Sequence, residues 1–218
     1  MKYCALILAA GNSTRFQAKI NKLFYKINQK TVLELSLHNF IIDDDCKAII
    51  VVYNPNLKEE FKKILANISC SKQVIMVAGG NYRHDSFVKG IKHCLNYDWV
   101  MVHDGARPFL SFDLIKRIKE IISHKKNLEA IIPYLNIYHS LIEISNNNLK
   151  YLNRNNIKII QTPQCLKVKS IIDIINKNNK DYSDEFSWIL SFKNINYELI
   201  NGDNDNFKIT YLKDVKYL

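Results

Sequence analysis

The segment Tyr3-Cys4-Ala5-Leu6-Ile7-Leu8 runs without a break into Ala9-Ala10-Gly11, and this junction decides the fold. Its first six residues form a short, continuous apolar run, which predicts a buried strand. The alanines and the glycine that follow predict a loop, in which small side chains let backbone N–H groups approach a bound phosphate closely. A strand that ends in a phosphate-binding loop is one interpretation; an ordinary strand-to-helix loop is the other.

The same alternation of apolar runs and helical periods continues along the chain. We expect further strands at 47–52, 73–77, 99–102, 129–133 and 197–200, and helices at 31–40, 57–65, 84–95, 112–122, 168–175 and 183–192, with a short helix near the end. This order is typical of an α/β fold with a doubly wound, mostly parallel, Rossmann-like sheet. Ligands of such sheets lie at the carboxyl ends of the strands.

Residues 136–160 interrupt this pattern. No helical period can be followed through them, and Ser145-Asn146-Asn147-Asn148 predicts a turn between two short β-like segments. We therefore expect a single domain, 1–218, with a protruding β-arm at about 136–160.

Composition excludes several functional classes. The 218 residues are 47% hydrophobic and 24% charged, which suits one globular domain, and no apolar run reaches the about 18 residues of a membrane span. The net charge of +10 comes from lysines scattered along the chain, so a small anionic substrate is a better interpretation than nucleic acid. Five widely spaced cysteines without a C-x-x-C pair favour reduced thiols and a cytoplasmic location.

Three expected strands end in unusual sequences, namely Ala9-Ala10-Gly11, Gly79-Gly80 and the segment His103-Asp104-Gly105-Ala106-Arg107-Pro108. We expect these loops to converge at one sheet edge. Hydroxyl groups and fixed positive charge for a triphosphate follow the first of them, at Ser13, Thr14, Arg15 and Lys22. The spacing matches neither the Walker pattern nor the dinucleotide pattern G-x-G-x-x-G.

The loop L-A-A-G-x-x-x-R followed by a lysine resembles the signature loop of sugar-phosphate nucleotidyltransferases. Five further motifs, which with the loop cover nearly the whole chain, resemble the 2-C-methyl-D-erythritol 4-phosphate cytidylyltransferase family: Gly79-Gly80-Asn81-Tyr82-Arg83-His84-Asp85-Ser86, Val102-His103-Asp104-Gly105-Ala106-Arg107-Pro108, Arg154 with Gln161-Thr162-Pro163-Gln164, Ser183-Asp184-Glu185, and Asn206-Phe207-Lys208-Ile209-Thr210.

The resemblance implies a reaction of CTP with methylerythritol phosphate that gives the diphosphocytidyl alcohol and pyrophosphate. It implies charge stabilisation by Arg15 and Lys22, and Mg²⁺ held by Asp104, whose alternative role is a helix or loop cap. CTP would be bound by Ala9, Ala10, Gly11, Asn12, Ser13, Gly79, Gly80, Asp85 and Ser86. The acceptor phosphate would be bound by Arg107, Ser140, Arg154, Thr162, Ser183 and Lys208. Asp85 and Ser86 also suit the N-cap of the following helix.

The sequence departs from the family pattern at two places. His139-Ser140 stands where the arm of the family reads Asp-Thr, and Asn21-Lys22-Leu23 stands where Pro-Lys-Gln is usual. These changes leave the motifs of the nucleotide-binding half of the site intact and concern the identity of the acceptor alcohol. In the family the arm crosses a two-fold homodimer, so Arg154 is expected to serve the partner's site.

Two other functions were weighed against this one. A ribitol-5-phosphate cytidylyltransferase shares the nucleotide motifs, but its family more often carries Thr in place of Asp85. A non-catalytic nucleotide- or RNA-binding protein would be expected to have lost part of the charged set, whereas this chain keeps all of it, namely Arg15, Lys22, Asp104, Arg154 and Lys208.

Overall fold

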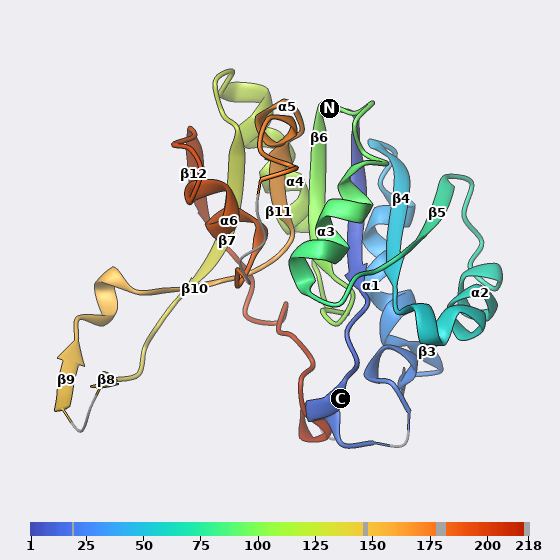
Figure 1. Cartoon of the computed structure of the whole chain (residues 1–218), viewed down its shortest axis with the longest axis horizontal. Coiled ribbons are helices and arrows are strands. Elements are labelled where there is room, and N and C mark those ends of the chain that lie inside the picture. The colour runs from blue at the N-terminus through green and yellow to red at the C-terminus, as the bar shows by residue number, and fades with distance from the viewer. Residues whose placement is uncertain (19, 146–147, 178–181, 216–218) are drawn as a thin grey trace.

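A mixed sheet forms the centre of the computed structural model, which describes the chain except residue 19, residues 146–147, 178–181 and 216–218 (Figure 1). Among the described residues, this sheet has eight strands: seven in the order β10-β7-β11-β6-β1-β4-β5, and β12, which also pairs with β7. The bounds are β1 Tyr3–Ala9, β4 Cys46–Tyr53, β5 Gln73–Ala78, β6 Trp99–Asp104, β7 Ala130–Asn136, β10 Lys158–Ile160, β11 Gln164–Lys167 and β12 Tyr197–Asn201.

The half of the sheet around β1 is parallel, as the sequence predicts. Strand β1 pairs with both β4 and β6, and β5 extends the sheet beyond β4. The other half is mixed, because β11 lies antiparallel between β6 and β7, and β10 is antiparallel to β7. The expected α/β class is confirmed. The sheet also contains two strands that the apolar pattern does not predict, β10 and β11.

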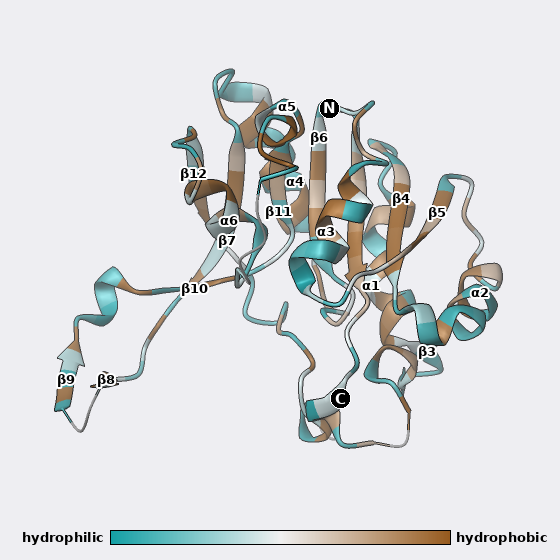
Figure 2. Ribbon diagram, in the orientation of Figure 1, coloured by the Kyte–Doolittle hydropathy of each residue, from teal (hydrophilic) through white to brown (hydrophobic). Residues whose placement is uncertain are grey.

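Helices cover both faces of the sheet, and the alternation of side chains along β1 shows why. Ala5 and Ile7 face one hydrophobic cluster, and Cys4 and Leu6 face another. The first cluster contains buried side chains of α1 (Val32–Ile42), α2 (Lys58–Ala66) and α4 (Phe112–His124), and the second contains those of α3 (Arg83–Ile91), α5 (Lys169–Ile172) and α6 (Glu185–Leu190). Apolar segments accordingly lie along the strands and on the inner helix faces (Figure 2).

Several helices are shorter than the sequence predicts. The helix expected at 84–95 ends at Ile91, because the next N–H groups, of His93 and Cys94, bond to carbonyls three residues back. Likewise the helix expected at 168–175 covers only α5, and the one expected at 183–192 covers only α6. In contrast, α1 begins where a capping box from Thr31 and Glu34 fixes its start.

The expected arm is present as a two-stranded hairpin of β8 (Leu141–Ser145) and β9 (Asn148–Leu152), which projects away from the sheet (Figure 1). The middle of its expected turn, residues 146–147, lies outside the described residues. Large apolar side chains of the hairpin are exposed, for example Ile144 at 71% and Tyr151 at 74%. No helix among the described residues is long and apolar enough to cross a membrane.

Candidate active site

A cavity of about 740 Å³ opens at the carboxyl ends of the parallel strands, and three expected loops meet in it. The lining contains the loop after β1, the Gly79-Gly80 loop after β5 and Asp104 at the end of β6. The C-terminal motif contributes Lys208, as expected, together with Thr210. One segment that the sequence analysis did not predict also lines the cavity, namely Asn54–Asn56, which follows β4. The signal that could have identified Asn54–Asn56 is a polar turn directly after the apolar run of β4.

The loop after β1 is bridged by the side chain of Asn21, a residue that departs from the family pattern. Asn21 donates to the Gly11 carbonyl at 3.2 Å and accepts from the Ser13 hydroxyl at 2.9 Å. Ser13 has a left-handed backbone with φ of 56°. Asn21 thus closes this turn through side-chain contacts. The predicted CTP-binding residues of this loop line the cavity together, namely Ala9, Ala10, Gly11, Asn12 and Ser13.

Lys22 and Arg15 both line this cavity, as the prediction of their catalytic role requires. Lys22 lies at the start of a 3-10 turn, and its ammonium donates to the carbonyl of Ile209 at 2.7 Å. Burial and the neighbouring positive charges of Lys208 and Arg15 together lower the pKa of Lys22 to about 8, although the negative charge of Asp104 opposes them. An anion bound here would therefore gain unusually large stabilisation from Lys22.

The Gly79-Gly80 loop packs closely on the loop after β1. A Cβ on Gly79 would lie only 2.4 Å from that of Ala10, so a larger residue does not fit. The Ser86 hydroxyl accepts from the Gly80 N–H at 3.1 Å, and Gly79, Gly80 and Ser86 all line the cavity. Asp85 does not line it: its carboxylate accepts from the N–H of Tyr82 at 3.2 Å and so caps α3, the alternative role weighed for it.

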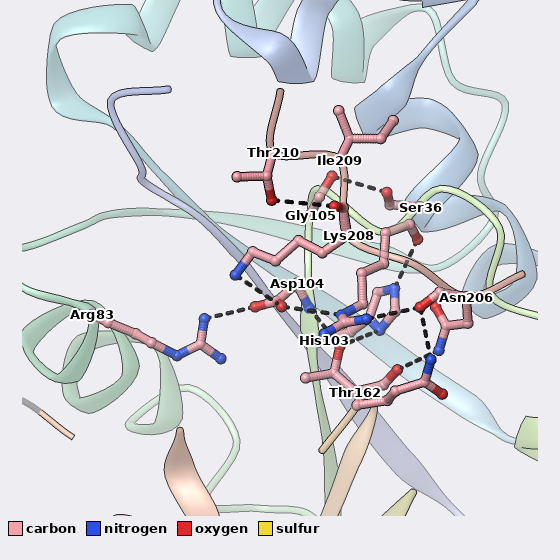
Figure 3. A network of polar contacts seen from close by, with 12 residues as sticks. Ser36, Arg83, His103, Asp104, Gly105, Thr162, Asn206, Lys208, Ile209 and Thr210 are labelled. Carbon is pink, nitrogen blue, oxygen red and sulfur yellow. Dashed lines mark hydrogen bonds and ion pairs between the residues drawn. The ribbon is translucent and has the colours of Figure 1, made fainter. Parts of the chain in front are cut away.

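Asp104 is the most heavily paired carboxylate of the site (Figure 3). Its oxygens lie 2.6 Å from the Arg83 guanidinium, 3.1 Å from the Lys208 ammonium and 3.2 Å from the Arg107 guanidinium. These cations hold the pKa of Asp104 well below its usual range, although burial opposes them. Arg107 also donates to the carbonyl of Asn206 at 2.8 Å, which ties β6 to the C-terminal segment.

Thr162 is buried and contacts the backbone of Asp104 (Figure 3). Its hydroxyl accepts from the Asp104 N–H at 3.1 Å. His103 Nε2 donates to the Arg107 carbonyl at 3.1 Å, so its Nδ1 is unprotonated and accepts from the Thr162 hydroxyl at 3.0 Å. Burial lowers the pKa of His103 to about 4, which keeps the ring neutral. Thr162, predicted to bind the acceptor phosphate, here orients the Asp104 backbone.

Of the other residues predicted to bind the acceptor phosphate, one lines the cavity and the rest do not. Lys208 lines the cavity, whereas Arg107 lies beneath it, paired to Asp104. Ser140, Arg154 and Ser183 are exposed and do not line it within one chain. Arg154 donates to the Tyr138 carbonyl of the arm at 2.6 Å. One copy of the chain therefore assembles the nucleotide half of the predicted site without the arm.

Two site residues escaped the prediction although their motifs had been noticed. Arg83 lines the cavity, and Glu185, buried in α6, lies 2.9 Å from its second guanidinium nitrogen. Four cations thus face the cavity against one carboxylate among the described residues that line it: Arg15, Lys22, Arg83 and Lys208 against Asp104. Such an excess of positive charge suits a polyphosphate.

Asp104 is the side chain that could hold a divalent cation. The described residues contain no group of three or more His, Cys, Asp or Glu side chains arranged to hold a metal ion. Mg²⁺ needs only one or two carboxylates when substrate phosphates and water complete its coordination. Because three cations already surround Asp104, its donor set fits Mg²⁺ that arrives with a triphosphate rather than a free ion.

Comparisons with family models, curated proteins and solved structures all indicate the same family. Residues 3–217 match the family described as IspD, 2-C-methyl-D-erythritol 4-phosphate cytidylyltransferase. The protein of that name from Clostridium tetani is 34% identical over 98% of this chain and 87% of its own length. The crystal structure of 4-diphosphocytidyl-2C-methyl-D-erythritol synthase from Anaerococcus prevotii has a TM-score of 0.82 and 25% identity, over 99% of this chain and 96% of that one. The bifunctional IspDF from Campylobacter jejuni has a TM-score of 0.83 and 27% identity; all of this chain covers 54%, or about half, of that protein.

Proposed function

Because the chain belongs to the 2-C-methyl-D-erythritol 4-phosphate cytidylyltransferase family, we propose that it transfers the cytidylyl group of CTP to 2-C-methyl-D-erythritol 4-phosphate and releases pyrophosphate. This reaction contributes to isoprenoid precursor synthesis. The observation that carries the proposal is the cavity in which Arg15, Lys22 and Lys208 meet at the end of β6. The cytosol remains the location expected from the sequence.

The reaction is an in-line displacement at the α-phosphorus of CTP. An oxygen of the acceptor phosphate attacks, and pyrophosphate leaves from the opposite side. A phosphate monoester is already a nucleophile, so the protein has to position the reactants and stabilise the charge that develops. Arg15 and Lys22 lie beside the loop after β1 and supply that charge, while Gly80 and Ser86 offer hydrogen bonds to the cytosine.

Mg²⁺ is part of this proposal. Asp104 would hold it against the triphosphate, where it would neutralise negative charge on the reacting phosphates. The role of the protein is to keep Asp104 ionised and oriented, and the cations around Asp104 and the Thr162 hydroxyl behind it support that role.

A homodimer completes the proposal. Ser140 and Arg154 lie on the arm, away from the cavity of their own chain, and the hairpin exposes apolar side chains that a partner would cover. In this arrangement, Arg154 of one subunit binds the acceptor phosphate in the site of the other. The two-fold symmetry would build two equivalent sites.

A pyrophosphate-release assay tests the proposed function. The wild-type protein is expected to turn over CTP with 2-C-methyl-D-erythritol 4-phosphate far faster than with ribitol 5-phosphate, and far faster than it turns over ATP or GTP. The segment Gly80–Ser86 resembles the cytosine-binding segment of the family, and a purine would need more room than a pyrimidine there. Comparable rates with ATP would contradict the assignment of the pyrimidine pocket, and a preference for ribitol 5-phosphate would contradict the acceptor.

A further inference from the structure

Arg83 bridges two carboxylates that come from different parts of the fold. One guanidinium nitrogen lies 2.6 Å from Asp104, at the end of β6, and the other lies 2.9 Å from Glu185, in the first turn of α6. Glu185 is 3% exposed, and its carboxylate lies outside the cavity lining. Glu185 therefore reaches the cavity through Arg83, whose guanidinium separates it from Asp104.

The α6 helix does not need this carboxylate at its N-terminus. The Asp184 side chain accepts from the Ser187 N–H at 2.8 Å and caps the helix. The Gln164 side chain accepts from the Phe186 N–H at 2.9 Å. Because other residues bind these two N–H groups, the carboxylate of Glu185 is not needed to cap α6 and pairs with Arg83 instead.

Stability is also a poor explanation for the pair. Burial raises the pKa of Glu185 in spite of the neighbouring Arg83. A buried ion pair pays a desolvation cost that its attraction often fails to exceed, and apolar residues of similar volume are often equally stabilising. The Arg83 Nε is buried with no hydrogen-bond partner among the described residues, so the guanidinium is held through its two terminal nitrogens.

We propose that Glu185 is a positioning residue for the transfer reaction: it holds Arg83, and Arg83 in turn fixes the orientation of the Asp104 carboxylate. The contact between Arg83 and Asp104 is the shortest of the three ion pairs of Asp104. Without Glu185, the guanidinium loses one of its two anchors and can rotate about its remaining contact. Asp104 then loses its fixed direction toward the reacting phosphates. This inference rests on the proposed cytidylyl transfer.

The test compares steady-state kinetics and thermal unfolding of Glu185→Gln, Glu185→Asp and a control. Glu185→Gln keeps the shape and removes the charge; we expect kcat to fall about 10- to 100-fold, with little change in the KM for CTP. Glu185→Asp restores the carboxylate and is expected to recover part of the lost kcat. The control is Asp43→Asn, at the opposite end of the sheet, where a carboxylate that is also 3% exposed pairs with Lys119 at 2.7 Å. It should lower the unfolding temperature and leave kcat unchanged.

A double-mutant cycle separates positioning from folding. Arg83→Gln leaves Glu185 as an unpaired buried charge, so adding Glu185→Gln is expected to raise the unfolding temperature. The double variant should have the same kcat as Arg83→Gln alone, because Glu185 acts only through Arg83. Independent losses of kcat that multiply would overturn the proposal, and so would wild-type kcat in Glu185→Gln. If Glu185→Gln does not fold, the comparison of Arg83→Gln with the double variant decides in the same way. Failure of the wild-type protein to release pyrophosphate would instead refute the proposed function.

Discussion

At the scale of single residues, Lys22 carries a charge that its surroundings make unusually costly. Its ammonium is partly buried, and Lys208 and Arg15 lie close enough to lower its pKa to about 8. Among the described residues, its hydrogen-bond partner is a neutral carbonyl, that of Ile209. In the proposed reaction, a triphosphate that develops negative charge during transfer would relieve this cost, so we expect Lys22 to stabilise the transition state more than the ground state.

Lys22→Ala is therefore expected to lower kcat by orders of magnitude, with a smaller effect on CTP binding. The other three cations of the cavity still attract the triphosphate in this variant. Steady-state kinetics together with equilibrium binding of CTP make the comparison. A large increase in KM at unchanged kcat would show that Lys22 contributes to ground-state binding only.

The pH dependence follows from the same pKa. As pH rises through about 8, Lys22 in the free protein loses its proton, so kcat/KM for CTP should fall on the alkaline side. Bound triphosphate favours the charged form, so kcat itself should fall only at higher pH. Lys22→Arg keeps its charge at all these pH values and should lose the alkaline limb of kcat/KM. An unchanged limb in that variant would assign it to another group.

At the scale of elements, the cavity depends on how closely two loops pack. Gly79 lies against Ala10 so tightly that an added Cβ would clash at 2.4 Å, whereas a Cβ on Gly11 meets nothing within 4 Å. Both glycines line the cavity. The two positions thus separate glycine needed for packing from glycine needed for ligand approach.

Gly79→Ala is expected to cost about 1–3 kcal/mol of unfolding free energy and to weaken CTP binding, because the loop after β1 must move. Gly11→Ala should leave the unfolding free energy nearly unchanged and still weaken CTP binding, since its methyl group would occupy space that a phosphate needs. Chemical denaturation and calorimetric titration with CTP measure both effects. Wild-type affinity in Gly11→Ala would remove that residue from the binding loop.

Elements also show what the sequence could and could not predict. The parallel strands β1, β4 and β6 are buried on both faces, so each appears in the sequence as a nearly continuous apolar run. In contrast, β11 has only four residues, beginning with Gln164, and owes its place to the neighbours β6 and β7. The cavity cations Arg15, Lys22 and Lys208 and the glycines were predictable from motifs. The pairing of Arg83 with Glu185 was not, because it depends on how α3 and α6 pack.

At the scale of the whole molecule, the arm holds two of the predicted acceptor residues, Ser140 and Arg154, away from the cavity of their own chain. A lone two-stranded hairpin is marginally stable in water, and this one exposes Ile144 and Tyr151. A second copy of the chain would cover such side chains and deliver Arg154 to a cavity that lacks it. Whether Arg154 acts in its own subunit or in its partner is therefore a question about assembly.

Mixing two inactive variants answers it. Lys22→Ala and Arg154→Ala are each expected to be inactive alone, but in a mixed dimer one site inherits both defects and the other inherits neither. Random exchange of equal amounts should restore about a quarter of wild-type sites, because of the two-fold symmetry. Native mass spectrometry verifies the exchange. Proven mixed dimers without recovered activity would mean that Arg154 does not serve the partner's site.

The segment Asn206–Thr210 also sets the order in which the site can form during synthesis. Lys22 and the Ile209 carbonyl that binds it are 187 positions apart in the chain, and Arg107 is 99 positions from the Asn206 carbonyl. Before the ribosome has added Asn206–Thr210, a nascent chain can already pair β1, β4, β5 and β6. It still lacks the Ile209 carbonyl that binds Lys22 and the Lys208 ammonium that pairs with Asp104. The charged cavity is therefore complete only after Asn206–Thr210 has been synthesised, and a stalled fragment that ends before Asn206 would have the sheet without these contacts.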